Sequence, residues 1–259
     1  MRAALRMTVV AAGLLVVWQA VVSITGAQPF ILPGPLAVAA ALAKHGGLIL
    51  PHAGTTLAEI LLGLCIGAAL GAFSALVVAH VRPARLWLLP VLVASQAVPV
   101  FAIAPVLVLW LGYGMASKVA MAVLIIFFPV TAAFYDGLSR TDPGWLDLAR
   151  SMGASRWRQL LHLRIPAALP ACASGLRVAT AVAPIGAIVG EWVGASAGLG
   201  YLMLHANARM QVDLMFAALI VLAAMALTLY FTVDRLLRLA VPWQADTLFQ
   251  EPAKDPNAP

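Results

Sequence analysis

Six long apolar stretches dominate the chain, and polar segments separate them. Each stretch can form one helix across a membrane, because a hydrocarbon core of about 30 Å takes about 20 apolar helical residues. The third stretch is interrupted by Pro90, Pro99 and Pro105. The pattern predicts an all-α, polytopic membrane protein with six transmembrane helices. The predicted spans cover about Met7–Thr25, Thr56–His80, Leu86–Leu111, Val119–Phe134, Ala168–Val189 and Leu214–Leu237.

Two polar segments carry signals for shorter helices. The sequence Pro33-Gly34-Pro35 indicates a turn, after which the Ala-rich segment Leu36–Lys44 is expected to form a short helix at the outer membrane surface. The segment Gly190–Gly200 is rich in Gly, Ala and Ser, and we expect another short helix over Tyr201–Met210. The sequence shows no convincing internal repeat of the kind found in many secondary transporters.

Composition also places the chain in the membrane class. Hydrophobic residues make up 63% of the 259 residues and charged residues only 10%, whereas average chains carry about 25% charged residues. This length leaves no room for an added soluble enzyme domain. Cys65 and Cys172 lie within apolar stretches and the five His residues are scattered. We therefore expect no disulfide and no metal site.

The net charge of +6 is better explained by membrane orientation than by nucleic-acid binding, because the basic residues lie in short segments between the spans. With the N-terminus inside, most of the 16 Lys and Arg residues fall in inner segments. Lys44, Lys118 and Arg209 fall in outer segments, and Arg177 lies within the fifth span. The positive-inside rule predicts that both termini are cytoplasmic. After a transmembrane domain over residues 1–243, the polar segment 244–259 is expected to be a disordered tail.

The N-terminus also has features of a secretory signal peptide. Arg2 and Arg6 precede an apolar run, and cleavage after it would leave five spans. The small-residue site at Thr25-Gly26-Ala27 is poor, since Gln28-Pro29 follows it. The sequence therefore favours an uncleaved first span.

The inner segment from Ser139 to Ala167 is too long and too patterned for a simple connection. Asp142 can cap a helix that has Pro143 in its first turn and continues to about Met152. Gly153 suits the left-handed turn that ends such a helix. Ser155 can cap a second helix to about Leu163. The segment therefore predicts two short helices hinged at a glycine.

This helix pair has an apolar and a basic face. Such a surface can lie on anionic lipid headgroups or dock into a groove of a partner protein, and the residues alone do not decide between them. The apolar residues are Leu146, Leu148, Ala149, Met152, Trp157, Leu160 and Leu161, and the basic residues are Arg150, Arg156, Arg158 and Arg164.

The same segment resembles the EAA loop of binding-protein-dependent ABC transporter permeases. That pattern has E-A-A, three residues, G, nine residues, I, one residue and L-P. This sequence keeps the spacing, with Asp for Glu, Leu for the first Ala and an exchange of the aliphatic residues at Leu163 and Ile165. The resemblance implies that the loop docks on a separate ATPase subunit and transmits its closure. The residues that it implies for coupling are Asp147, Ala149, Gly153, Leu163, Ile165 and Pro166.

The chain carries no ATPase site of its own. A phosphate-binding Walker A loop needs a Gly-Lys pair, and the sequence has none. We therefore expect no catalytic residue and no cofactor in this chain, with ATP bound by the partner subunit.

Further motifs are similar to the nitrate, sulfonate and taurine branch of these permeases. They are Ile31–Pro35, Ser95–Pro99, Ala104-Pro105, Leu111–Gly114, Gly190–Gly194 and Gly198–Leu202, while Gly190–Phe216 most resembles importers of thiamine-related pyrimidine precursors. The resemblance implies a type I ABC importer permease fold in the bacterial inner membrane. It also implies a homodimer with two ATPase subunits and a periplasmic solute-binding protein. An aliphatic sulfonate, taurine or nitrate permease is the alternative within the family.

Charged residues inside membranes cost about 2.5–3.5 kcal/mol on insertion scales and are therefore functional candidates. Glu59 near the outer end of the second span could instead reach the headgroups, and Arg177 could pair structurally. Glu191 and Trp192 lie beside flexible glycines, and Gln96 lies in the proline-broken stretch that should face the bundle interior. The candidate translocation path is Gln96, Arg177, Glu191 and Trp192.

Gly63, Gly67 and Gly71 lie on one face of the second span and would allow another helix to approach closely. Two other classes of protein remain as competing interpretations. An ion-coupled secondary transporter would carry paired carboxylates within the membrane and an internal repeat. A membrane enzyme would carry a cluster of His, Asp or Cys at one membrane face.

Overall fold

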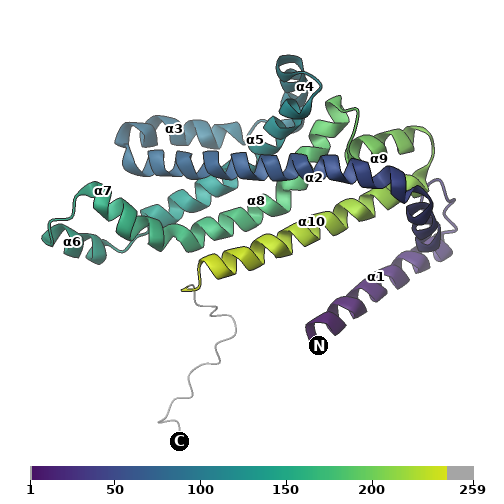
Figure 1. Ribbon diagram of the computed structural model, residues 1–259, viewed down its shortest axis with the longest axis horizontal. Coiled ribbons are helices and arrows are strands. Elements are labelled where there is room, and N and C mark those ends of the chain that lie inside the picture. The colour runs from purple at the N-terminus through teal and green to yellow at the C-terminus, as the bar shows by residue number, and fades with distance from the viewer. Residues whose placement is uncertain (1, 244–259) are drawn as a thin grey trace, which may run out of the picture.

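The computed structural model describes residues 2–243, and all regular structure in this range is helical (Figure 1). The expected tail over 244–259 lies outside the described residues. The helices are α1 (Arg2–Thr25), α2 (Pro35–His80), α3 (Arg82–Ser95), α4 (Val100–Leu111), α5 (Met115–Ser139), α6 (Pro143–Ser151), α7 (Arg156–Gln159), the π-helical turn η1 (Leu160–Arg164), α8 (Ile165–Gly194), α9 (Leu199–Ala208) and α10 (Val212–Ala240).

Five helices in the described chain are long and apolar enough to cross a membrane: α1, α2, α5, α8 together with the segment before it, and α10. The helices α3 and α4 form a pair bent by 100° that makes a sixth span if they cross together. The predicted third span is therefore broken, because Pro99 removes a backbone donor where α4 begins. The other span predictions are confirmed in place, with most helices longer than expected.

The separate outer helix predicted over Leu36–Lys44 was wrong. The helix α2 is 46 residues long and continues through Gly46, Gly47 and Pro51. Its N-terminal part packs into a buried cluster with α9 and α10, which includes Val38 and Ile49 of α2. Tertiary packing of this kind stabilises the helix across residues that would interrupt it in isolation.

The core of the fold is the packing of α5 between α2 and α8. Gly63 and Gly186 approach Ala122 of α5 from the two neighbouring helices. A Cβ atom added at Gly63 would lie 2.5 Å from the Ala122 Cβ, and one added at Gly186 would lie 2.6 Å from the Ala122 Cα. Small residues thus bring three backbones together, as they do in other membrane bundles.

The glycine face predicted on the second span lies against α5. A Cβ atom at Gly67 would lie 2.7 Å from the Ile126 Cγ2, and one at Gly71 would lie 2.6 Å from the Phe127 carbonyl oxygen. Gly71 also accepts a hydrogen bond on its carbonyl from the Thr131 hydroxyl, at 3.2 Å. The face therefore serves close packing of α2 on α5.

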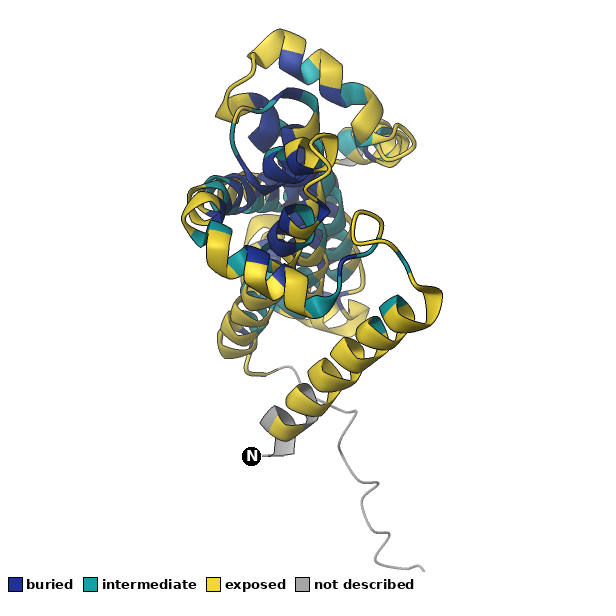
Figure 2. Cartoon of the chain, turned by 90° about the vertical axis from the view of Figure 1, so that its right-hand side faces the viewer, coloured by how far each residue is buried: buried dark blue, intermediate teal, exposed yellow. Residues whose placement is uncertain are grey.

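The helix α1 lies apart from this bundle (Figures 1 and 2). No residue of its span-length window Thr8–Thr25 is buried. Trp18 stacks on Phe216 of α10, with ring centroids 5.9 Å apart. Apart from Trp18, most apolar side chains of α1 are therefore left for lipid or for another protein chain.

The two short helices of the coupling segment project at one end of the bundle, opposite α9 (Figure 1). Asp142 caps α6 by accepting the Gly144 N–H at 2.6 Å, and Ser155 caps α7 by accepting the Arg158 N–H at 3.3 Å. Gly153 between them has a φ of +78°, which glycine adopts without steric cost.

The second predicted short helix does not end at Leu163. It continues through η1 into α8, and Arg156–Gly194 forms one helical stretch of 39 residues. The π-helical turn accommodates one extra residue in the helix. Pro166 follows this turn and has no N–H to continue the helical hydrogen bonds, so the irregular turn lies where the proline interrupts them. The coupling segment is thus joined directly to a span.

Candidate functional sites at the two ends of the bundle

The surface of α6 and α7 combines exposed apolar and charged side chains. Leu148 is 62% exposed, Met152 79% and Trp157 57%. Asp147 is exposed and forms an ion pair with Arg150, at 2.7 Å between the Arg150 Nη1 and the Asp147 Oδ1. Large apolar residues exposed at the end of a bundle are typical of a protein-binding surface. We call this surface the coupling surface.

The structure places the predicted coupling residues in two groups. Asp147 and Gly153 are exposed on the coupling surface. The half-buried residues are Ala149, Leu163, Ile165 and Pro166. The last three lie at the junction of η1 with α8, where the coupling surface joins that helix.

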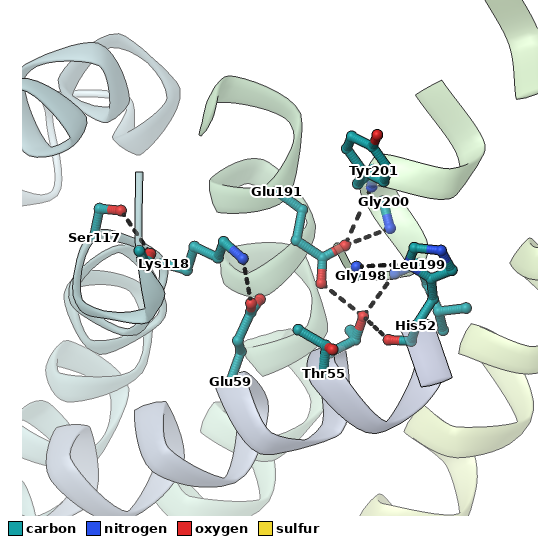
Figure 3. A network of polar contacts seen from close by, with 12 residues as sticks. His52, Thr55, Glu59, Ser117, Lys118, Glu191, Gly198, Leu199, Gly200 and Tyr201 are labelled. Atoms are coloured by element: carbon teal, nitrogen blue, oxygen red, sulfur yellow. Dashed lines mark hydrogen bonds and ion pairs between the residues drawn. The ribbon is translucent and has the colours of Figure 1, made fainter. Parts of the chain in front are cut away.

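At the opposite end of the bundle, Glu191 forms the centre of a buried polar network (Figure 3). It lies in the last turn of α8 and is 1% exposed. The Thr56 hydroxyl donates to the Glu191 Oε1 at 2.6 Å. The backbone N–H groups of Gly200 and Tyr201 donate to its Oε2, the latter at 3.4 Å. The carboxylate thus joins α8 to α2 and α9.

Two further hydrogen bonds tie the turn before α9 to α2. The Leu199 N–H donates to the Thr56 hydroxyl oxygen at 2.8 Å, and the Gly198 N–H donates to the His52 Nδ1 at 2.9 Å. The His52 ring stacks on Tyr201, with centroids 5.9 Å apart. The N–H groups at the start of α9 thus all donate to side chains of α2 and α8. We call the three accepting residues, His52, Thr56 and Glu191, the α9 cap.

A buried ion pair lies next to the α9 cap. The Lys118 Nζ lies 2.9 Å from the Glu59 Oε1, and the two side chains are 6% and 0% exposed. Lys118 lies in the first turn of α5, where the helix dipole disfavours a cation. Glu59 therefore supplies the compensating charge.

This ion pair corrects two expectations from the sequence. Lys118 was assigned to an outer loop, but it lies in α5 and is buried. Glu59 does not reach the surface, because its side chain is enclosed between α2 and α5. Sequence reasoning also missed Thr56 and His52, for which the only signal was a polar side chain near the start of an apolar stretch.

Arg177 also has a carboxylate partner within the chain. Its Nε donates to the Asp234 Oδ1 of α10 at 2.6 Å, and the Arg238 Nε donates to the Asp234 Oδ2 at 3.0 Å. Arg177 and Asp234 are 23% and 18% exposed. Two guanidinium groups share the Asp234 carboxylate, which links α8 to α10.

The remaining two path candidates occupy different places. Trp192 is 46% exposed and lines an apolar groove of about 620 Å³ between α8, α9 and α10. Gln96 is exposed in the break between α3 and α4, where its Nε2 donates to the Ser95 hydroxyl at 3.3 Å. Arg177 and Glu191 are 14 positions apart on α8, roughly 21 Å along the axis. The four candidates therefore do not form one cluster in this chain.

The arrangement matches a known family of transport proteins. Residues 67–245 match the family of the binding-protein-dependent transport system inner membrane component. This chain belongs to that family. It is a membrane-spanning ABC transporter permease subunit of the inner membrane, and its relatives include permeases named for formylaminopyrimidine, aliphatic sulfonate and taurine transport.

Individual relatives cover almost the whole chain. A probable ABC transporter permease protein of Haemophilus influenzae is 59% identical over 86% of this chain and 91% of its own length. The formylaminopyrimidine transport permease ThiX of Halalkalibacterium halodurans is 36% identical over 89% of this chain and 92% of its own. The riboflavin transport system permease RibX of Chloroflexus aurantiacus is 39% identical over 90% of this chain and 87% of its own length.

Solved structures support the fold. A chain of the MetNI methionine ABC transporter in an inward-facing conformation aligns with a TM-score of 0.65 and 18% identity. The alignment covers 76% of this chain and 97% of that chain. The predicted type I ABC importer permease fold is therefore confirmed. The family also replaces the ion-coupled transporter as the class of protein.

Proposed function

We propose that this chain is the permease subunit of an ABC importer for a small planar nitrogen heterocycle, with a thiamine-related pyrimidine precursor as the first candidate. The observation that carries the proposal is the 36% identity to the formylaminopyrimidine permease over 89% of the chain. The riboflavin relative supports the same chemical class, because riboflavin also contains a fused pyrimidine ring.

The groove beside Trp192 suits such a solute. Its lining is mostly apolar, with Asn207 as a polar side chain and Trp192 as an aromatic one. Small-molecule sites commonly combine apolar walls with a few polar groups that fix orientation. A planar heterocycle can stack on the indole of Trp192 while its ring nitrogens bond to an amide.

The coupling surface is the proposed contact with the ATPase subunit. Trp157, Leu148 and Met152 would fill a groove on the partner, and no ATP would bind to this chain. The half-buried junction of η1 with α8 would carry the movement into the span. The interaction would bury apolar side chains that are otherwise exposed to water beyond the membrane.

A second copy of the chain is the proposed partner at the groove. The groove lies on the outside of a single chain, and two copies facing each other would enclose it as a path. The exposed helix α1 provides further apolar surface for lipid or the second copy. A periplasmic binding protein would deliver solute at the α9 end, with the coupling surface and both termini in the cytoplasm.

Uptake by cells tests the proposed solute. Cells lacking the gene are compared with cells that carry the wild-type gene, using labelled formylaminopyrimidine, riboflavin, taurine and nitrate. We expect gene-dependent uptake of formylaminopyrimidine, reduced by Trp192→Ala and retained by Trp192→Phe. Uptake of taurine or nitrate without the heterocycles would refute the solute class and leave the permease assignment in place.

A further inference from the structure

The helix α9 has no capping side chain of its own. Its N-cap residue is Gly198, and no side chain in its own first turn accepts the free N–H groups. Three of these N–H groups instead donate to residues of other helices: Leu199 to Thr56, and Gly200 and Tyr201 to Glu191. Unpaired buried N–H groups destabilise a helix end, so α2 and α8 determine where α9 can begin.

The turn before α9 is shaped around the Glu191 carboxylate. Gly198 has a φ of +118°, and an added Cβ atom there would overlap the Glu191 carboxyl carbon. A Cβ atom at Gly200 would lie 2.9 Å from the Glu191 Oε2. Two glycines are therefore needed for the backbone to approach the carboxylate, and α9 has one well-defined position against it.

The helix held by this cap forms one wall of the groove. Leu204 and Asn207 of α9 line it, opposite Ile185 and Trp192 of α8. Trp192 directly follows Glu191 in α8. The Trp192 side chain lines the groove, and the Glu191 carboxylate binds α9, which forms the opposite wall. The position of α9 relative to Trp192 sets the width of the groove and the place of the Asn207 amide.

We propose that Thr56 and Glu191 are positioning residues for solute passage, acting by holding α9 as the wall of the groove. The Thr56 hydroxyl has the central place, since it donates to Glu191 on α8 and accepts from Leu199 on α9. A movement of α2 relative to α8 would therefore shift α9. This inference rests on the proposed function only in taking the groove as the solute path.

Three threonine variants isolate the hydroxyl group. Thr56→Val keeps the shape of the side chain and removes the bonds to Glu191 and from Leu199, together with the bond to the His52 carbonyl of its own helix at 3.2 Å, whereas Thr56→Ser keeps them. Thr55→Val is the matched control, because the Thr55 hydroxyl donates only to the Pro51 carbonyl of its own helix, at 3.3 Å. Each variant is assembled with the ATPase subunits and the binding protein in lipid nanodiscs or vesicles.

Hydrogen–deuterium exchange of the amides of residues 199–201 is the direct readout. Thr56→Val is expected to raise their exchange rate at least about ten-fold, because a bond to a charged group and a capped N–H are lost together. Thr56→Ser and Thr55→Val are expected to exchange like the wild type. Unchanged exchange in Thr56→Val would overturn the inference.

The kinetics of solute uptake distinguish a displaced α9 from a general loss of stability. Unfolding of part of the sample lowers formylaminopyrimidine uptake and ATP hydrolysis together and leaves the KM unchanged. A displaced wall is expected to raise the KM for solute uptake by about five-fold or more and to lower the solute moved per ATP, with Thr56→Ser restoring both. Faster exchange with an unchanged KM and ratio would also overturn the proposal.

Failure of the proposed function gives a different pattern. If the wild-type complex moves no formylaminopyrimidine, the solute assignment fails. The exchange measurement needs no solute: protected amides in Thr56→Val would still overturn the inference, and rapid exchange would support the step in which Thr56 holds α9.

Discussion

Removing the charge of Lys118 is expected to be among the most damaging changes to the stability of the bundle. Its partner Glu59 is fully buried, 2.9 Å away. With an effective dielectric constant of about 20, two unit charges at that distance attract by about 6 kcal/mol. Desolvation of both ions offsets part of this gain. Breaking a buried pair by removing one partner costs about 3–5 kcal/mol, because the other charge stays buried alone.

The assay is reversible unfolding of the purified chain by sodium dodecyl sulfate, followed by tryptophan fluorescence. Lys118→Met is expected to lower the free energy of unfolding by about 3–5 kcal/mol. Adding Glu59→Gln to it is expected to recover most of that loss, because residue 59 then no longer carries a buried charge without its lysine partner. Lys44→Met, at an exposed position of α2, is the control and is expected to change stability by less than about 0.5 kcal/mol.

Two outcomes would refute this reasoning. If Lys118→Met were as stable as the control, the buried pair would contribute nothing to stability. If the double variant were no more stable than Lys118→Met, the loss would come from packing of the lysine side chain and not from the charge left on Glu59.

Three further predictions concern packing, the coupling surface and the α8–α10 ion pairs. Gly186→Ala is expected to destabilise the chain by about 1–3 kcal/mol through overpacking on α5, while Gly46→Ala, whose Cβ atom would meet nothing within 4 Å, should be nearly neutral in the same unfolding assay. Gly153→Ala is expected to cost about 1–2 kcal/mol at its positive φ and to weaken ATPase binding in a pull-down; full binding would contradict its place in the coupling surface. Asp234→Asn is expected to lower the melting temperature by leaving Arg177 without a charged partner, and Asp234→Glu should restore part of it; equal melting temperatures for wild type and Asp234→Asn would show that the ion pairs add no stability.

Most of the fold could be predicted from the pattern of apolar stretches in the sequence. The spans followed from stretch length alone, because only a helix satisfies its own backbone hydrogen bonds in lipid. The caps at Asp142 and Ser155 and the turn at Gly153 followed from local chemistry, which acts over a few residues. The break at Pro99 was visible as a proline, but the 100° bend depends on how α4 packs and could not be read from the sequence.

The candidate site was harder to predict than the fold, because the residues that contact one another in it are far apart in the sequence. Thr56 and Leu199 are 143 positions apart, and Thr56 and Glu191 are 135 apart. Lys118 lies close to the start of α5, so the sequence alone indicated an exposed loop residue. Its burial depends on the ion pair with Glu59, which only the packing of α2 on α5 brings close. Arg177 and Glu191 were identified as costly charges, but their partners Asp234 and Thr56 required the packing of α10 and α2 against α8.

The most direct test of the central claim is solute uptake by sealed vesicles that contain this chain, its ATPase subunits and its binding protein. The account predicts that formylaminopyrimidine accumulates only when hydrolysable ATP is supplied on the side of the coupling surface, and that no accumulation follows an imposed proton or sodium gradient. Accumulation driven by an ion gradient in the absence of ATP would contradict it and would favour an ion-coupled secondary transporter.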